Sequence, residues 1–282
     1  MAGPRRDILG RGHASWRHAP NEARVRDDRD VYPTPVGGSD LGGPDGHSYG
    51  AAIVPAAGGK LPEVQAILSV IRFSGWIAPP RDGWSVVLGD PGDRVVADGR
   101  RDVIQVAELL AERVSGPVLA VRVRRDRQLA LVAWRAGEEV ARYCSDPSRE
   151  PGADKDVLAE PVGAEYAETF ADLWDRPDAV EELTELLEHE LDPDSVYESE
   201  RLGRVLRLLG LPAWLVAAGE LPHAMPTGPR SSELIRMRAG RTGVAGVIAG
   251  MFVRPVRRRQ QPPPVIADPP KGGGMGFEEW MF

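Results

Sequence analysis

The sequence predicts an α+β protein in which a small, mostly antiparallel sheet is covered by helices and followed by an acidic helical region. Three observations lead to this prediction. Short apolar runs alternate with amphipathic stretches from residue 49 onward, three further apolar runs follow one another with only short turns between them, and acidic helical patterns come next. Strands joined by short turns pair as antiparallel neighbours, which favours such a sheet.

The first elements expected are a strand, a helix and a second strand. The run Tyr49–Pro55 is apolar, and Pro62 stands at a first helical position, where its missing N–H is harmless. Apolar residues at i, i+3, i+4 and i+7 from Val64 predict a helix over 62–73. The next β-rich run, 84–88, is stopped by a Gly-Asp-Pro-Gly turn.

A second helix and three strands complete this first region. Apolar residues recur at helical spacing between Val103 and Val114, and three segments expected to be strands, 117–123, 128–134 and 139–144, follow. The turns between these runs are short, so we expect a meander with both helices on one of its faces. Together these elements predict an α+β sandwich over residues 49–145.

The next region, residues 146–228, is predicted to be helical and to pack on the sandwich. Its first part, residues 146–200, contains 19 acidic and 3 basic residues. Pro177 is placed to open one helix. Ser195 begins a capping-box pattern for a second helix over 195–209, and Gly210 supplies a left-handed stop.

The charge then reverses in the basic segment, residues 229–259, which contains eight arginines and one glutamate. This segment is expected to be partly helical. One helix would begin at Leu234, and a second apolar stripe at helical spacing begins at Val244 and would end at Pro255. A candidate basic patch lies at its end and comprises Arg254, Arg257, Arg258 and Arg259.

Both ends of the chain are expected to be disordered. Residues 1–48 are rich in Arg, Asp, Gly and Pro and lack periodicity, which is typical of a disordered lead. Residues 260–282 begin with proline-rich sequence that predicts an extended, exposed linker, and they end in an aromatic tip.

The sequence excludes several classes of protein. A single cysteine, Cys144, excludes an intramolecular disulfide and a Cys-rich zinc site. The first residues contain no apolar stretch of signal-peptide length, and the longest apolar run, 244–253, is too short to span a bilayer. The cytoplasm is therefore the expected compartment.

No catalytic residue, cofactor or metal site is predicted. The turn Gly58–Lys60 lies between a strand and a helix, but Val54 and Leu61 replace the Gly and the Ser or Thr that a phosphate loop requires. His189 and Glu190 begin a metalloprotease pattern, but Pro193 occupies the position of its second His. An alternative hypothesis still places a small-ligand or enzyme site near Gly58–Lys60.

The basic segment has three possible roles, in order of preference. It would dock on the acidic region of its own chain, or bind a membrane surface through residues 240–259, or contact nucleic acid. Nucleic acid is the least favoured partner because no aromatic residues interleave with the arginines for base stacking.

The leading functional hypothesis concerns the aromatic tip. Exposed aromatic clusters often anchor binding hot spots, and here they follow a Gly- and Pro-rich tether. We therefore expect a non-enzymatic adaptor that binds a protein partner through its tail, although self-docking and an inert tail remain open. The tip residues are Phe277, Trp280, Met281 and Phe282.

One further pattern spans residues 83–212. A Gly-Trp strand at 83–90 is followed by a helix, a Pro-Val-Leu-Ala-Val strand at 117–121, a hairpin ending near Asp146, and a Leu-Leu-Gly-Leu-Pro turn at 208–212. This layout resembles a group of uncharacterised bacterial proteins of the actinobacterial type. The resemblance implies no activity and no catalytic residue.

Overall fold

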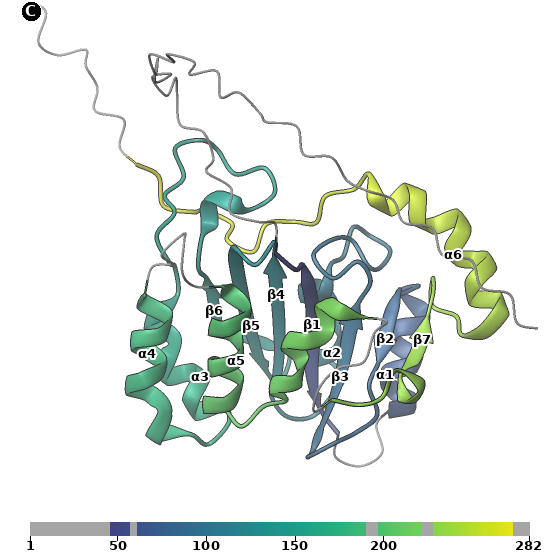
Figure 1. The fold of residues 1–282 in the computed structure, drawn as a ribbon, viewed down its shortest axis with the longest axis horizontal. Helices are drawn as coiled ribbons and strands as arrows, with labels where there is room; N and C mark the ends of the chain where they lie inside the picture. The colour runs from purple at the N-terminus through teal and green to yellow at the C-terminus, as the bar shows by residue number, and fades with distance from the viewer. Residues whose placement is uncertain (1–45, 57–60, 190–196, 222–227, 273–282) are drawn as a thin grey trace, which may run out of the picture. The chain divides into compact units, whose positions relative to one another are not determined.

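A single antiparallel sheet forms the centre of the protein in the computed structural model, which describes residues 46–56, 61–189, 197–221 and 228–272. All of these residues belong to one unit of the chain. The sheet has seven strands in the order β6-β5-β4-β1-β3-β2-β7, and every neighbouring pair is antiparallel (Figure 1). The strands are β1 (Tyr49–Pro55), β2 (Gly75–Ile77), β3 (Trp84–Gly89), β4 (Val118–Arg124), β5 (Gln128–Arg135), β6 (Glu138–Cys144) and β7 (Ile235–Met237).

Helices cover both faces of the sheet, which confirms the predicted α+β class. One core contains side chains of α1 and α2, and the other contains side chains of α3, α4 and α5 (Figure 1). The α-helices among the described residues are α1 (Leu61–Val70), α2 (Val103–Ala111), α3 (Ala167–Leu173), α4 (Val180–Glu188), α5 (Glu198–Leu208) and α6 (Gly243–Arg258).

The strand sequences explain why the sheet is covered on two sides. Side chains alternate along a strand, so Ala51 and Ile53 of β1 enter one core while Ala52 and Val54 enter the other. Strands buried on both faces lack a polar face and read as continuous apolar runs. The central strands β1, β4 and β5 have this character.

Two strands differ from the expectations. β2 was not predicted, and the segment that begins near Leu234 forms strand β7 instead of a helix. β7 pairs with β2, with Trp76 opposite Arg236, so the basic segment completes the sheet formed by the first region. Three-residue strands are too short to show periodicity, and only the tertiary pairing defines them.

Helices α5 and α6 differ from the sequence-based expectations at their ends: α5 begins at Glu198, and α6 ends after Pro255. The first turn of α5 is capped from a distance, because the Ser199 N–H donates to Asp126 Oδ1 at 2.7 Å, and Ser195 lies outside the described residues. Helix α6 does not end at Pro255 but continues to Arg258. A proline in the last turn removes only one intrahelical hydrogen bond, which is compatible with this extension.

The proline-rich linker is extended as expected, but it is not exposed along its length. Val265 is fully buried in the same core as α2, and its N–H donates to Glu150 Oε2 at 3.2 Å. Further on, the Leu158 N–H donates to Pro270 O, and Lys271 pairs with Asp154. Residues 260–272 therefore pack on the folded unit.

A helix that spans a bilayer needs about 20 predominantly apolar residues. No helix within the described ranges is long and apolar enough to cross a membrane.

Candidate interaction surface on helix α6

Of the three candidate sites predicted from the sequence, the structure describes only the basic patch. The aromatic tip, Phe277–Phe282, and the Gly58–Lys60 turn lie outside the described residues. The basic patch lies on α6 and at its C-terminal end. Figure 1 shows α6 beside the β7 end of the sheet, apart from the helices that cover its two faces.

A stripe of glycines holds α6 against the rest of the protein. A Cβ atom added at Gly246 would lie 2.4 Å from the Arg241 carbonyl oxygen, and one added at Gly250 would lie 3.2 Å from Arg238 Cβ. Glycine permits this close approach of the helix to the turn that follows β7. The two glycines are therefore packing positions of α6.

Arg257 continues the same stripe and anchors the last turn of the helix. Its Nη1 donates to Val96 O at 2.8 Å, and its Nη2 donates to Arg72 O at 2.7 Å and to Asp98 Oδ1 at 2.9 Å. Arg257 is buried, so its assignment to an exposed basic patch needs correction. Arg254, Arg258 and Arg259 are exposed.

The opposite side of α6 is apolar and open to solvent. Six of the nine large apolar side chains that are exposed in the described part of the chain belong to this helix. Phe252 is 75% exposed and Met251 is 69% exposed. With 3.6 residues per turn, most of these side chains point away from Gly246, Gly250 and Arg257. The outward face consists of Val244, Ile248, Met251, Phe252 and Val256.

Positive charge accompanies this outward face. α6 contains no acidic residue, and no acidic residue occurs between Glu233 and Asp268. Arg254 and Arg258 lie on one flank of the helix, while Arg259 follows its last turn. The surface therefore combines exposed apolar side chains with arginines, and no carboxylate on the helix offsets their charge.

The basic segment does contact its own chain, but not through the expected partners. Arg236 pairs with Asp90 and stacks 3.6 Å above the centre of the Trp76 ring, and Arg257 pairs with Asp98. These carboxylates lie between β3 and α2, not in the acidic region 146–200. The described ion pairs therefore join the basic segment to the loop between β3 and α2, and none of them joins it to the acidic region.

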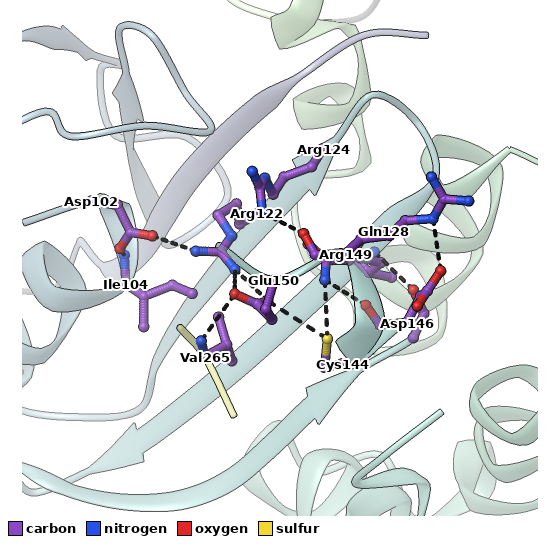
Figure 2. A network of polar contacts seen from close by, with 12 residues as sticks. Asp102, Ile104, Arg122, Arg124, Gln128, Cys144, Asp146, Arg149, Glu150 and Val265 are labelled. Atoms are coloured by element: carbon purple, nitrogen blue, oxygen red, sulfur yellow. Dashed lines mark hydrogen bonds and ion pairs between the residues drawn. The ribbon is translucent and has the colours of Figure 1, made fainter. Parts of the chain in front are cut away.

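A buried polar network lies at the end of β4 (Figure 2). Arg122 is fully buried and lies between two carboxylates, with Nη1 2.7 Å from Asp102 Oδ2 and Nη2 2.6 Å from Glu150 Oε1. Asp102 also caps helix α2, because its side chain accepts from the Ile104 and Gln105 N–H groups. This network joins β4, the start of α2 and the Glu150 loop.

The network continues toward the surface through Asp146, which lies between β6 and the short 3₁₀ helix η2 (Pro147–Arg149). Arg149 Nε donates to Asp146 Oδ2 at 2.7 Å, and Arg124 Nη1 donates to Arg149 O at 2.7 Å (Figure 2). Gln128 also donates to Asp146 O at 2.6 Å. These contacts hold the side chains of Arg124 and Arg149 in place relative to the sheet.

Cys144 belongs to the interior of this network. Its side chain is fully buried, and burial together with the Glu150 carboxylate raises the pKa of the thiol above its ordinary range. A thiolate is the reactive form of cysteine, so these surroundings make Cys144 inert. No group of three or more potential metal ligands occurs among the described residues.

Comparisons with other proteins give no functional assignment. No protein-family model matches the chain, and neither a curated protein nor a solved structure matches it. The resemblance proposed for residues 83–212 therefore stays a prediction.

Sequence reasoning identified the apolar stripe of α6 but not the side on which the helix packs. Both the apolar stripe and the Gly246–Gly250 pair have helical spacing. Glycine lowers helix propensity, so from the sequence alone the pair counts against a surface helix. Their close contacts with the Arg238–Arg241 turn are visible only in the fold.

Proposed function

We propose that the protein associates peripherally with an anionic membrane surface through the outward face of α6. The observation that supports this proposal most strongly is the combination of five exposed apolar side chains with arginines on a helix that has no acidic residue. Interfacial helices bind membranes in this way, with the apolar side chains at the acyl boundary and the cations near anionic headgroups.

The expected energies are sufficient for reversible binding. Full burial of one large apolar side chain contributes about 1.5–3 kcal/mol, and partial insertion contributes less. Each arginine near an anionic leaflet adds about 1 kcal/mol, which salt weakens. Several such contributions from Ile248, Phe252 and the flanking Arg254 and Arg258 would give salt-dependent association.

A vesicle co-sedimentation assay tests the proposal. The full-length protein should sediment with phosphatidylcholine vesicles that contain phosphatidylserine, and much less with phosphatidylcholine alone. The double variant Ile248→Gln/Phe252→Gln should bind at least about tenfold more weakly, because a loss of 1.4 kcal/mol is a factor of ten. Val70→Gln is the matched control, since Val70 is 83% exposed on α1.

Two results would contradict the membrane proposal. The first is no sedimentation of the wild type with phosphatidylserine vesicles. The second is equal binding by the wild type and by the Ile248→Gln/Phe252→Gln variant. Capture of a protein that requires Ile248 and Phe252, without vesicle binding, would instead assign the face to a protein partner.

The adaptor hypothesis for the aromatic tail stays a separate proposal. Its residues Phe277–Phe282 lie outside the described residues, so no contact supports it. The structure does improve its test, because Lys271 pairs with Asp154 and Gly272 donates to Asp156 O at 2.7 Å. A deletion for a pull-down should therefore begin at residue 273.

A further inference from the structure

A cavity of about 470 Å³ opens beside the buried network, where several arginines come together. The end of β4 contributes Arg124, the β4–β5 turn contributes Arg125 and Arg127, and η2 contributes Arg149. A volume of this size is within the range of small-molecule sites, roughly 300–1,000 Å³.

The opposite wall comes from two other parts of the chain. The loop between β3 and α2 contributes Arg94, and the end of α6 contributes Arg258 and Arg259. Asp93 is the one carboxylate among the described residues that line the cavity, beside a total of seven arginines. The cavity is therefore strongly cationic.

The protein holds part of this cluster in place before any ligand binds. Arg124 donates to Arg149 O, and Arg149 donates to Asp146, so the end of β4 and η2 are joined directly (Figure 2). The adjoining Glu150 is fixed by the buried Arg122. Groups that are already ordered lose less conformational entropy when they bind a ligand.

Arg149 is neutralised by Asp146, whereas three other arginines of the cavity have no such partner in the described part of the chain. No ion pair there joins Arg94, Arg258 or Arg259 to a carboxylate. Burial and the neighbouring Arg122 guanidinium lower the pKa of Arg124. Crowded like charges are relieved when an anion of several charges binds between them.

We propose that this cavity binds an anion that carries several phosphate groups. Guanidinium groups bind phosphate oxygens through paired hydrogen bonds, and seven of them match more than one phosphate. No aromatic side chain lines the cavity among the described residues, so the stacking that single-stranded nucleic acids require is lacking. The site contains none of the apolar residues of the outward face of α6, although it includes the flanking Arg258, and its existence does not require membrane binding.

Calorimetric titration of the full-length protein with sodium tripolyphosphate tests the site. The wild type should bind it saturably with one site per chain. The double variant Arg94→Gln/Arg259→Gln should raise the Kd at least tenfold, because it removes two exposed guanidinium groups with no structural hydrogen bond among those described. The double variant Arg113→Gln/Arg135→Gln is the charge-matched control, since both side chains are exposed and lie outside the lining. No binding by the wild type, or equal weakening in both variants, would overturn the proposal.

A second arm separates a soluble ligand from a lipid headgroup. If tripolyphosphate displaces the protein from vesicles containing phosphatidylinositol bisphosphate, but not from phosphatidylserine vesicles of equal charge, the phosphate source is the headgroup. If tripolyphosphate binds without any preference for the bisphosphate vesicles, the source is a free phosphorylated molecule. Both results support the site.

The apolar face provides the last control. The Ile248→Gln/Phe252→Gln variant should bind tripolyphosphate with wild-type affinity, so failure of the membrane proposal leaves this result unchanged. Loss of tripolyphosphate binding in that variant would contradict a phosphate site formed by the arginine cavity.

Discussion

Arg122 shows how one charged residue organises several segments of this protein. It occupies a core position of β4, on the face of the sheet that α2 covers, and it is fully buried. Its two carboxylate partners come from the start of α2 and from the loop after η2. Burial raises the pKa of Asp102 despite the ion pair, which indicates how strongly this site penalises an unpaired charge.

Replacement of Arg122 should therefore be costly. Arg122→Met leaves Asp102 and Glu150 buried without their cation, and removal of one partner of a buried pair costs about 3–5 kcal/mol. Urea unfolding at neutral pH should show this loss in the free energy of unfolding. Arg113→Met, at an exposed position, should change it by less than about 0.5 kcal/mol.

The pH dependence of this variant has a definite sign. Without Arg122, the pKa of Asp102 rises further in the folded state, because burial is no longer opposed by the guanidinium, so the folded variant takes up a proton as the pH falls. Neutral carboxyl groups are less costly to bury, and the stability difference from wild type should shrink between neutral and acidic pH. A difference that grows on acidification would contradict this account.

At the scale of elements, the packing of α6 determines what the protein presents to its surroundings. Its glycine stripe faces the turn after β7, and its apolar stripe faces solvent. A helix with bulky residues on both sides could not approach Arg238 and Arg241 as closely. The small residues therefore determine the orientation of the large ones.

Two glycine substitutions test this orientation. Gly246→Ala places a Cβ 2.4 Å from a backbone oxygen, so α6 must shift, and its amides should exchange hydrogen at least about tenfold faster. Gly203→Ala is the matched control on α5, where the new Cβ meets only ordinary contacts and should stabilise the helix by about 0.5–1 kcal/mol. Unchanged exchange in α6 of the Gly246→Ala variant would contradict the proposed packing.

Much of the element pattern could be predicted from the sequence, and the reasons are physical. Helix α2 shows a clear helical stripe, β4 and β5 are largely apolar runs, and short turns join them to each other and to β6. Strands β2 and β7 have three residues each, and β7 depends on its pairing with β2 far away in the chain, so neither strand is long enough to show a local pattern. The arginine cavity also escapes prediction, because its residues come from four separate segments.

At the scale of the whole molecule, the basic segment and the linker are parts of the fold. β7 extends the sheet, Arg257 anchors α6 to the loop after β3, and Val265 enters the α2 core. The basic segment is therefore packed on the same folded unit as the sandwich. Its outward apolar face and the nearby cationic cavity lie on this fixed support, which suits contact with an anionic surface.

Membrane binding through α6 is tested most directly by the fluorescence of a probe placed on the outward face of α6 when vesicles are present. A cysteine introduced as Ile248→Cys can be labelled with the fluorophore NBD, because the native Cys144 is buried and its thiol pKa is raised. Val70→Cys provides the same label on an exposed position of α1. Phosphatidylserine vesicles should shift the NBD emission to the blue and increase it at position 248 but not at position 70. No change at position 248, or equal changes at both positions, would contradict membrane binding through α6.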